Sequence, residues 1–209
     1  MESQPHRIIT IGRQYGSGGR EIGRRTAARL GFSFYDSELL TLAAKRAGLD
    51  PEVAAQAEER PTNGLLYNAP LGLGAARGTA AGMVQTPLTD QLFLAQSAVI
   101  RQLAQTEDCV IIGRCADYVL RGQAGLVTAF IHADLETRVQ RCVRYYGIDE
   151  ATARSRIRQT DRQRASYYAY FSDKRWGSYD AYDLMLDCGR FGVDGCAELL
   201  VRAATLPRP

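Results

Sequence analysis

The residues from Arg13 to Glu21 combine closely spaced glycines with flanking charges. They read Arg-Gln-Tyr-Gly-Ser-Gly-Gly-Arg-Glu and follow an apolar, β-rich run at positions 8–11. Small residues leave backbone N–H groups accessible, and a helix that begins directly after them turns its positive end towards an anion. We therefore expect the nucleotide phosphates to be bound by the backbone of four consecutive residues, Gly16, Ser17, Gly18 and Gly19.

The same residues nearly match the Walker A pattern, in which a first glycine and four variable residues precede Gly-Lys-Ser/Thr. The frame runs from Arg13 to Gly19, and Gly19 stands in the lysine position. We expect Arg20 or Arg13 to supply the missing positive charge. In place of the hydroxyl that normally holds Mg²⁺, we expect the Glu21 carboxylate to serve as the magnesium ligand.

Two other interpretations of the glycine-rich segment stay open. A dinucleotide site has the pattern Gly-x-Gly-x-x-Gly, and Gly16 and Gly18 supply its first half. Glu21 then occupies the third glycine position, although Asp36 lies at a suitable later position for the acidic residue. A tight turn that binds nothing is the third interpretation. Three glycines within four residues, flanked by arginines, favour a phosphate site.

A second group of charges lies between positions 154 and 175, where arginines and lysines outnumber the aspartates. Arg154, Arg158 and Arg162 recur at a four-residue spacing and so share one face of a helix. Phosphoryl transfer is catalysed largely by positioning and by cations that neutralise the phosphoryl oxygens. We expect Arg158, Arg162 and Arg164 to act in this way.

This basic helix has two alternative interpretations. It is a solvated basic face, or it grips single-stranded nucleic acid by stacking bases on Tyr167, Tyr168, Tyr170 and Phe171. The aromatic residues follow the arginines and do not alternate with them, and the formal net charge is only +3. We therefore expect no nucleic-acid partner and assign these aromatic side chains to packing.

The wider sequence alternates short β-branched runs with long helical patterns, which predicts a parallel sheet covered by helices in one α/β domain, residues 1–209. The segment Cys-Val-Ile-Ile-Gly is typical of a strand that is buried on both faces. The predicted strands are residues 7–12, 33–35, 109–113, 127–132 and 184–187.

Helical patterns separate these strands, and Asp134 is expected to cap the helix that follows it. The interval 60–87 is rich in glycine and proline and is interpreted as a mobile insertion loop. Residues 150 to about 177 are expected to form a lid-like region. The predicted helices are residues 19–30, 37–47, 51–59, 88–105, 135–146, 150–171 and 193–203.

The composition is ordinary for a soluble globular protein, with 45% hydrophobic and 23% charged residues. No apolar run approaches the roughly 18 residues that a membrane span needs, so we expect no membrane partner. The cysteines are odd in number and have no Cys-x-x-Cys spacing. They are therefore expected to be small buried hydrophobes in a reduced, cytoplasmic protein.

Three stretches together resemble the cytidylate kinase-like family, a branch of the P-loop nucleoside monophosphate kinases. They are ITIGRQYGSGGREIGRRTAARLGFSFYDSELL, VIIGRCADYVLR and YDLMLDCGRFG, and the arginine-rich helix lies between the last two. The resemblance implies a P-loop NTPase-type fold, a parallel five-stranded sheet flanked by helices with an arginine-rich helical lid. It also implies ATP with Mg²⁺ as the phosphoryl donor and a pyrimidine monophosphate as the acceptor.

Single positions also match the family. Asp36 resembles the aspartate that ends the second strand of cytidylate kinases and faces the acceptor, and Arg114 resembles the arginine of their Gly-Arg-Asp motif, which meets the monophosphate. Cys115 departs from that motif, and Asp117 is the nearest acid. The basic helix resembles the family's lid, where Asp161 and Arg164 fit its Asp-x-x-Arg pattern.

We therefore predict an ATP-dependent kinase that transfers the γ-phosphoryl group to a nucleoside monophosphate, CMP or dCMP. Its expected partners are small-molecule nucleotides, while the oligomeric state stays open. The lysine-free loop and Cys115 support a different hypothesis, a nucleotide-binding regulatory module without turnover. A kinase for another small metabolite is the third hypothesis.

Overall fold

The computed structural model describes residues 5–46, 48 and 87–207. The predicted helix 51–59 and the predicted mobile loop, except Pro87, lie outside these residues. Within them, no helix is long and apolar enough to cross a membrane.

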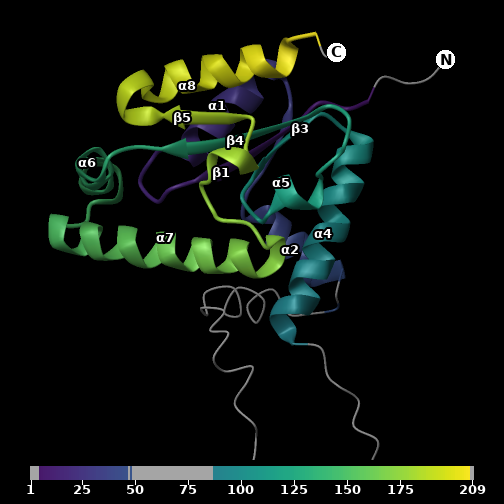
Figure 1. Ribbon diagram of the computed structural model, residues 1–209, viewed down its shortest axis with the longest axis horizontal. Helices are drawn as coiled ribbons and strands as arrows, with labels where there is room; N and C mark the ends of the chain where they lie inside the picture. Colours follow the sequence, from purple (N-terminus) through teal and green to yellow (C-terminus); the bar gives the residue numbers. More distant parts are fainter. Residues whose placement is uncertain (1–4, 47, 49–86, 208–209) are drawn as a thin grey trace, which may run out of the picture.

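Five parallel strands form the sheet, in the order β2-β3-β1-β4-β5 (Figure 1). β1 (Ile8–Arg13) is central, with Ile8 beside Cys109 on one side and Leu126 on the other. The flanking strands are β2 (Ser33–Tyr35), β3 (Cys109–Ile112), β4 (Leu126–His132) and β5 (Leu184–Asp187). β3 is buried along its whole length, as its apolar run predicted. The expected parallel five-stranded sheet is confirmed.

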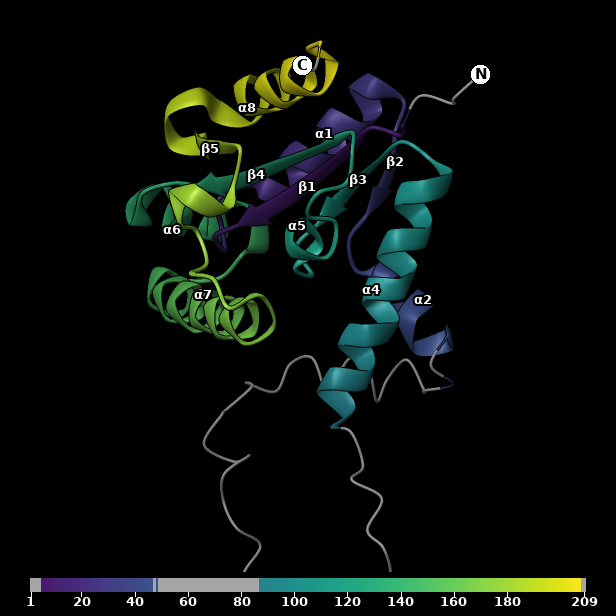
Figure 2. The ribbon, with the colours of Figure 1, turned by 45° about the vertical axis from the view of Figure 1, so that its right-hand side comes forward.

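Helices cover both faces of the sheet (Figure 2). On one face, α1 (Gly19–Leu30) and α8 (Cys188–Thr205) pack on alternate residues of β1, β3 and β4 through Ile22, Ala27 and Leu200. On the other face lie α4 (Leu88–Thr106) and the short α5 (Ala116–Val119), and α2 (Glu38–Arg46) packs on α4. The central strands β1 and β3 therefore have buried apolar residues on both faces, which explains their apolar runs.

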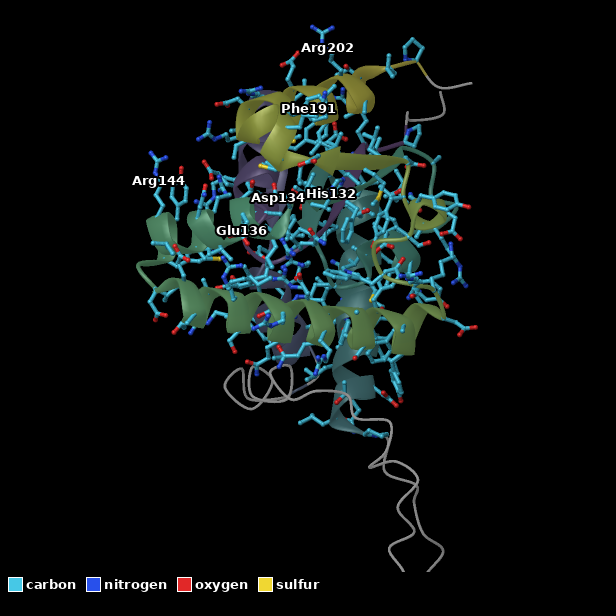
Figure 3. All side chains as sticks on the ribbon, turned by 60° about the vertical axis from the view of Figure 1, so that its left-hand side comes forward. His132, Asp134, Glu136, Arg144, Phe191 and Arg202 are labelled. Atoms are coloured by element: carbon cyan, nitrogen blue, oxygen red, sulfur yellow. The ribbon has the colours of Figure 1, made fainter. Side chains whose placement is uncertain are left out.

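Two further helices pack on each other beyond the carboxyl end of β4. They are α6 (Leu135–Tyr146) and α7 (Glu150–Ser172), which share an apolar contact of Val139 and Cys142 with Ala153 and Ile157. Asp134 caps α6 by accepting a 2.9 Å hydrogen bond from the Thr137 amide, which confirms the predicted cap. Figure 3 shows Asp134 close to His132, at the turn from β4 into α6.

The predicted boundaries differ most at the last helix. α8 begins five residues earlier than predicted, and Gly192 interrupts its first turns with a φ of 65°. Asp187 stabilises that early start, because its carboxylate accepts hydrogen bonds from the amides of Gly189 and Arg190. The glycines in this segment are typical of a loop. The Asp187 cap and the packing of Cys188 in the core nevertheless stabilise a helix here. The α5 helix and a 3₁₀ turn, Tyr179–Ala181, were not predicted.

Candidate functional site

The glycine-rich loop between β1 and α1 has the backbone that its sequence predicts. Gly16 and Gly18 have φ values of 78° and 84°, which are strained for any residue with a side chain. The buried Ser17 hydroxyl donates to the carbonyl oxygens of Gln14 and Ile131, at 2.9 and 3.2 Å. Ser17 therefore ties the loop to β4 with its side chain. Its amide, which we expected to bind phosphate, donates instead to the Gln14 carbonyl oxygen at 3.3 Å.

The amides at the start of α1 are available to a ligand. Among the described residues, none accepts a hydrogen bond from the amide of Gly16, Gly18, Gly19, Arg20 or Glu21. First-turn amides have no partner within a helix, and the helix dipole adds positive potential there. These residues line a cavity of about 510 Å³, here called the loop cavity. The arrangement is therefore suited to an anion.

Asp161 of α7 holds the loop in place. It accepts a 2.7 Å hydrogen bond from the Tyr15 amide, and its other oxygen pairs with the Arg138 guanidinium at 2.5 Å. This mostly buried ion pair joins the loop, α6 and α7. The sequence indicated Asp161 only as part of a motif shared with Arg164, and the contact between the loop and α7 required the fold.

A second cavity, of about 360 Å³, lies next to the first. Four aromatic side chains line it together with polar residues, and we call it the aromatic cavity; they are Tyr167, Tyr168, Trp176 and Tyr182. Asp117 also lines it and accepts a 2.6 Å hydrogen bond from the Tyr168 hydroxyl. Burial raises the pKa of Asp117 above its ordinary value. The cavity therefore offers a partly buried, hydrogen-bonding carboxyl to a flat ligand.

The turn after β3 carries the other polar groups of the aromatic cavity. Arg114 and Cys115 have positive φ values of 60° and 52°, which are uncommon for residues with side chains. Such strain is retained where the surrounding structure requires it. Here the turn places Arg114 in the cavity wall, where burial lowers the pKa of its guanidinium.

Arg13 and Arg164 line both cavities. The Arg164 guanidinium donates a 3.0 Å hydrogen bond to the Arg13 carbonyl oxygen. Burial, followed by the charge of Arg164, lowers the pKa of Arg13 well below its ordinary value. Asp36 interacts electrostatically with both and with Arg114, and its carboxylate is 2.6 Å from Arg20 Nε. Cations thus converge where the cavities meet, which favours a bound anion there.

Glu21, the predicted magnesium ligand, is engaged by two guanidinium groups. Its carboxylate oxygens lie 2.7 Å from Arg25 and 3.0 Å from Arg141. Among the described residues, no three His, Cys, Asp or Glu side chains form a metal site. As arranged, these residues do not fit a magnesium ligand set, and the role predicted for Glu21 stays a prediction. Mg²⁺ in phosphoryl-transfer enzymes is held largely by the substrate phosphates.

The structure divides the predicted lid arginines. Arg164 reaches both cavities, whereas Arg158 and Arg162 are exposed and line neither. Arg154, on the same face as these two, pairs with Glu136 at 2.6 Å. Two residues turn a helix by about 200°, so Arg162 and Arg164 must point in nearly opposite directions. The basic face therefore lies away from the described cavities.

The sequence reasoning missed several cavity residues. Arg141, Tyr145 and Tyr146 of α6 line the loop cavity, and the Arg141 guanidinium lies 4.8 Å from the Tyr145 ring centroid. Figure 3 shows Arg144, from the same helix, pointing outwards. In the sequence, the adjacent Tyr145 and Tyr146 at the end of α6 were the signal that could have indicated this part of the cavity. Trp176 and Tyr182 had none, because loops bring them to the aromatic cavity.

Comparison with known proteins relates this chain to kinases. Residues 8–190 match the sequence model of the cytidylate kinase-like family. The chain is also 25% identical to a cytidylate kinase from Methanopyrus kandleri, over 94% of this chain and 92% of that protein.

Solved structures give the same fold. An uncharacterized protein from Eubacterium ventriosum is 24% identical, with a TM-score of 0.72 over 97% of this chain and 100% of that one. A shikimate kinase from Bacteroides thetaiotaomicron has a TM-score of 0.54 at 14% identity, over 96% and 99% of the two chains. At this identity the likeness concerns the fold, which is that of the P-loop kinases.

Proposed function

The chain belongs to the cytidylate kinase-like family, and we propose that it transfers the γ-phosphoryl group of ATP to a nucleoside monophosphate, CMP or dCMP. Family and fold together support a phosphotransferase that acts on nucleotides or small molecules. The family and the fold imply ATP as donor, usually with Mg²⁺. The identity of the acceptor, CMP or dCMP, is what we propose beyond the family and the fold.

One observation carries the proposal, the meeting of two different cavities at Arg13 and Arg164. The loop cavity has amides and arginines that can bind a polyphosphate. The aromatic cavity has aromatic side chains and a carboxyl that can bind a nucleotide base. A kinase requires two such sites in contact, because the phosphoryl group passes directly from donor to acceptor.

The proposed reaction needs no base from the protein. A phosphate oxygen of the acceptor, already anionic, forms a bond to the γ-phosphorus, and the bond from that phosphorus to the bridging oxygen breaks to release ADP. The residues of this chain would position both nucleotides and stabilise charge. In this scheme the loop amides hold the donor phosphates, Arg114 holds the acceptor phosphate and Arg164 spans both. Mg²⁺, when bound with ATP, would add positive charge at the phosphates.

Acceptor choice would depend on Asp117 in this scheme. Its partly buried carboxyl lines the aromatic cavity, where it can accept a hydrogen bond from the amino group of a cytosine ring. Asp117 would then take the part of the family aspartate that Cys115 replaces. Asp36, which pairs with Arg20, would help to hold the loop arginines beside the acceptor phosphate.

The test is an assay of ADP release from ATP, Mg²⁺ and a panel of nucleoside monophosphates and common metabolites. We expect turnover with CMP and dCMP, at a kcat/KM at least about tenfold above that for UMP or AMP. Tight ATP binding without turnover on any acceptor would replace the proposal with a regulatory nucleotide-binding module. Turnover only with a metabolite other than a nucleotide would keep the kinase and change the acceptor.

A further inference from the structure

The phosphate loop departs from the Walker A pattern at three positions, since arginine also replaces the final Ser/Thr at position 20, and the departures at positions 13 and 19 are opposite in kind. Position 13, where the pattern has its first glycine, is arginine, and position 19, where it has lysine, is glycine. The pattern and this loop each have one glycine and one cation at these two positions, but in this loop the two residue types are exchanged.

The structure shows that the two positions compete for the same space. Arg13 ends β1 beside Ile131 of β4, and Gly19 begins α1 directly across from it. A Cβ atom on Gly19 would lie 2.5 Å from the Arg13 Cβ and 3.0 Å from its Cγ. Because real side chains do not approach so closely, a lysine stem has no room at position 19 while arginine occupies position 13.

A second glycine makes room for the other end of the same side chain. A Cβ atom on Gly113 would overlap Nη1 of the Arg13 guanidinium, and Gly113 also has a φ of 70°. The Arg13 side chain therefore runs from Gly19 to Gly113, from the phosphate loop to the end of β3. This course brings it into the walls of both the loop cavity and the aromatic cavity.

The Arg13 guanidinium has one long ion pair among the described residues. Its Nη2 lies 3.8 Å from Asp36, and no described residue accepts a hydrogen bond from its guanidinium. Arg20 differs on each count, because its Nε binds Asp36 at 2.6 Å, its side chain is 56% exposed and it lines only the loop cavity. Between the two candidates for the missing cation, the geometry favours Arg13.

We propose that the cation of the phosphate loop has moved from position 19 to position 13, where Arg13 binds the phosphoryl group during transfer, and that Gly19 and Gly113 are glycines to leave space for it. The inference rests on the proposed kinase function. A guanidinium at this point has several donors in one plane, so it can bind oxygens of the donor and of the acceptor together. A lysine has a single charged nitrogen.

The test is a set of variants that undo the exchange singly and together. Arg13→Gly removes the cation and Gly19→Lys creates the clash, so each should lower kcat/KM about 100-fold. The double variant carries both the first glycine and the lysine of the standard pattern. We expect it to recover at least about tenfold over either single variant. A double variant as poor as the product of the two single losses would overturn the proposal.

A second set of variants removes charge without requiring side chains to repack around position 19. Arg13→Gln keeps most of the stem beside Gly19 and removes the charge, so ATP affinity and kcat should both fall, with kcat down about 100-fold. Arg20→Ala should cost less than about tenfold, because this side chain is half exposed and paired with Asp36. Arg101→Gln, at an exposed position on α4, is the matched control for loss of one charge.

The outcomes separate the inference from the function on which it rests. If the wild type releases ADP and Arg13→Gln matches it within threefold, the proposal for Arg13 fails and the kinase stands. A larger loss in Arg20→Ala than in Arg13→Gln would also overturn it, in favour of Arg20. If the wild type neither binds ATP nor turns over with any acceptor, the proposed function fails and the inference fails with it.

Discussion

The two cavities that meet at Arg13 and Arg164 are built in different ways. The loop cavity takes most of its wall from one continuous segment, residues 13–24, and its ligand groups there are backbone amides and arginines. The aromatic cavity takes its wall from residues between 12 and 182, and its ligand groups are side chains. A site made of backbone follows from a local turn and helix, whereas a site made of side chains depends on the packing of distant segments.

The difference in chemistry matches the difference in construction. Amides and arginines bind phosphates, which nucleotides share, so the loop cavity suits a common donor. Aromatic side chains and a single partly buried carboxyl bind one shape and one pattern of hydrogen bonds, so the aromatic cavity suits a selected acceptor. We expect variants to separate along this line, apart from those at the shared arginines.

The largest effect is expected where the cavities share a residue. Arg164→Ala removes a partly buried cation from both, so kcat/KM should fall about 10³-fold whichever substrate is varied. Steady-state kinetics with ATP varied and then with the acceptor varied check this. Arg101→Ala, at an exposed position on α4, is the control. An equally large fall in kcat/KM in that variant would show that the effect does not depend on the place of Arg164 in the cavities.

A smaller effect, confined to the donor side, is expected from Gly16→Ala. A Cβ there would lie 2.9 Å from the Arg138 carbonyl oxygen and from the Cys142 sulfur, at a φ of 78°. Stability should fall by about 1–3 kcal/mol, and the KM for ATP should rise at least about tenfold. Urea unfolding and kinetics measure both. A rise only in the acceptor KM would contradict the division between the cavities.

The smallest kinetic effect is expected from Asp117→Asn, on the acceptor side. The variant keeps an oxygen for the Tyr168 hydroxyl but loses the charge, so the KM for CMP should rise about tenfold while the KM for ATP stays within twofold. Equal KM values for CMP in variant and wild type would remove Asp117 from acceptor binding.

The same variant has a pH-dependent effect on stability. The folded protein raises the pKa of Asp117, so between the ordinary and the raised value it binds more protons than the unfolded chain. Stability of the wild type relative to Asp117→Asn should therefore be greatest at acid pH and decrease as pH rises through that window. Urea unfolding of both proteins at pH 4 and pH 7 measures the change, and a relative gain at pH 7 would contradict it.

Sequence reasoning succeeded where the cause was local. The strand at 8–13, the glycine turn and the helix from Gly19 follow from neighbouring residues, and so does the Asp134 cap of α6. Sequence reasoning was less successful on α7. The periodicity predicted the helix, but it did not show which arginines reach a cavity. Helical spacing separates Arg164 from Arg158 and Arg162, but only the packing of α7 against the loop shows which side of the helix reaches a cavity.

By itself, the sequence determined that a parallel sheet carries a glycine-rich turn before a helix, because backbone geometry depends on glycines and apolar periodicity within a few residues. The tertiary structure alone decided that position 13 and position 19 compete for one space, and that Asp117, Tyr168 and Tyr182 surround one cavity. These contacts join segments far apart in the chain, and no local pattern records which side chains will meet across a folded core.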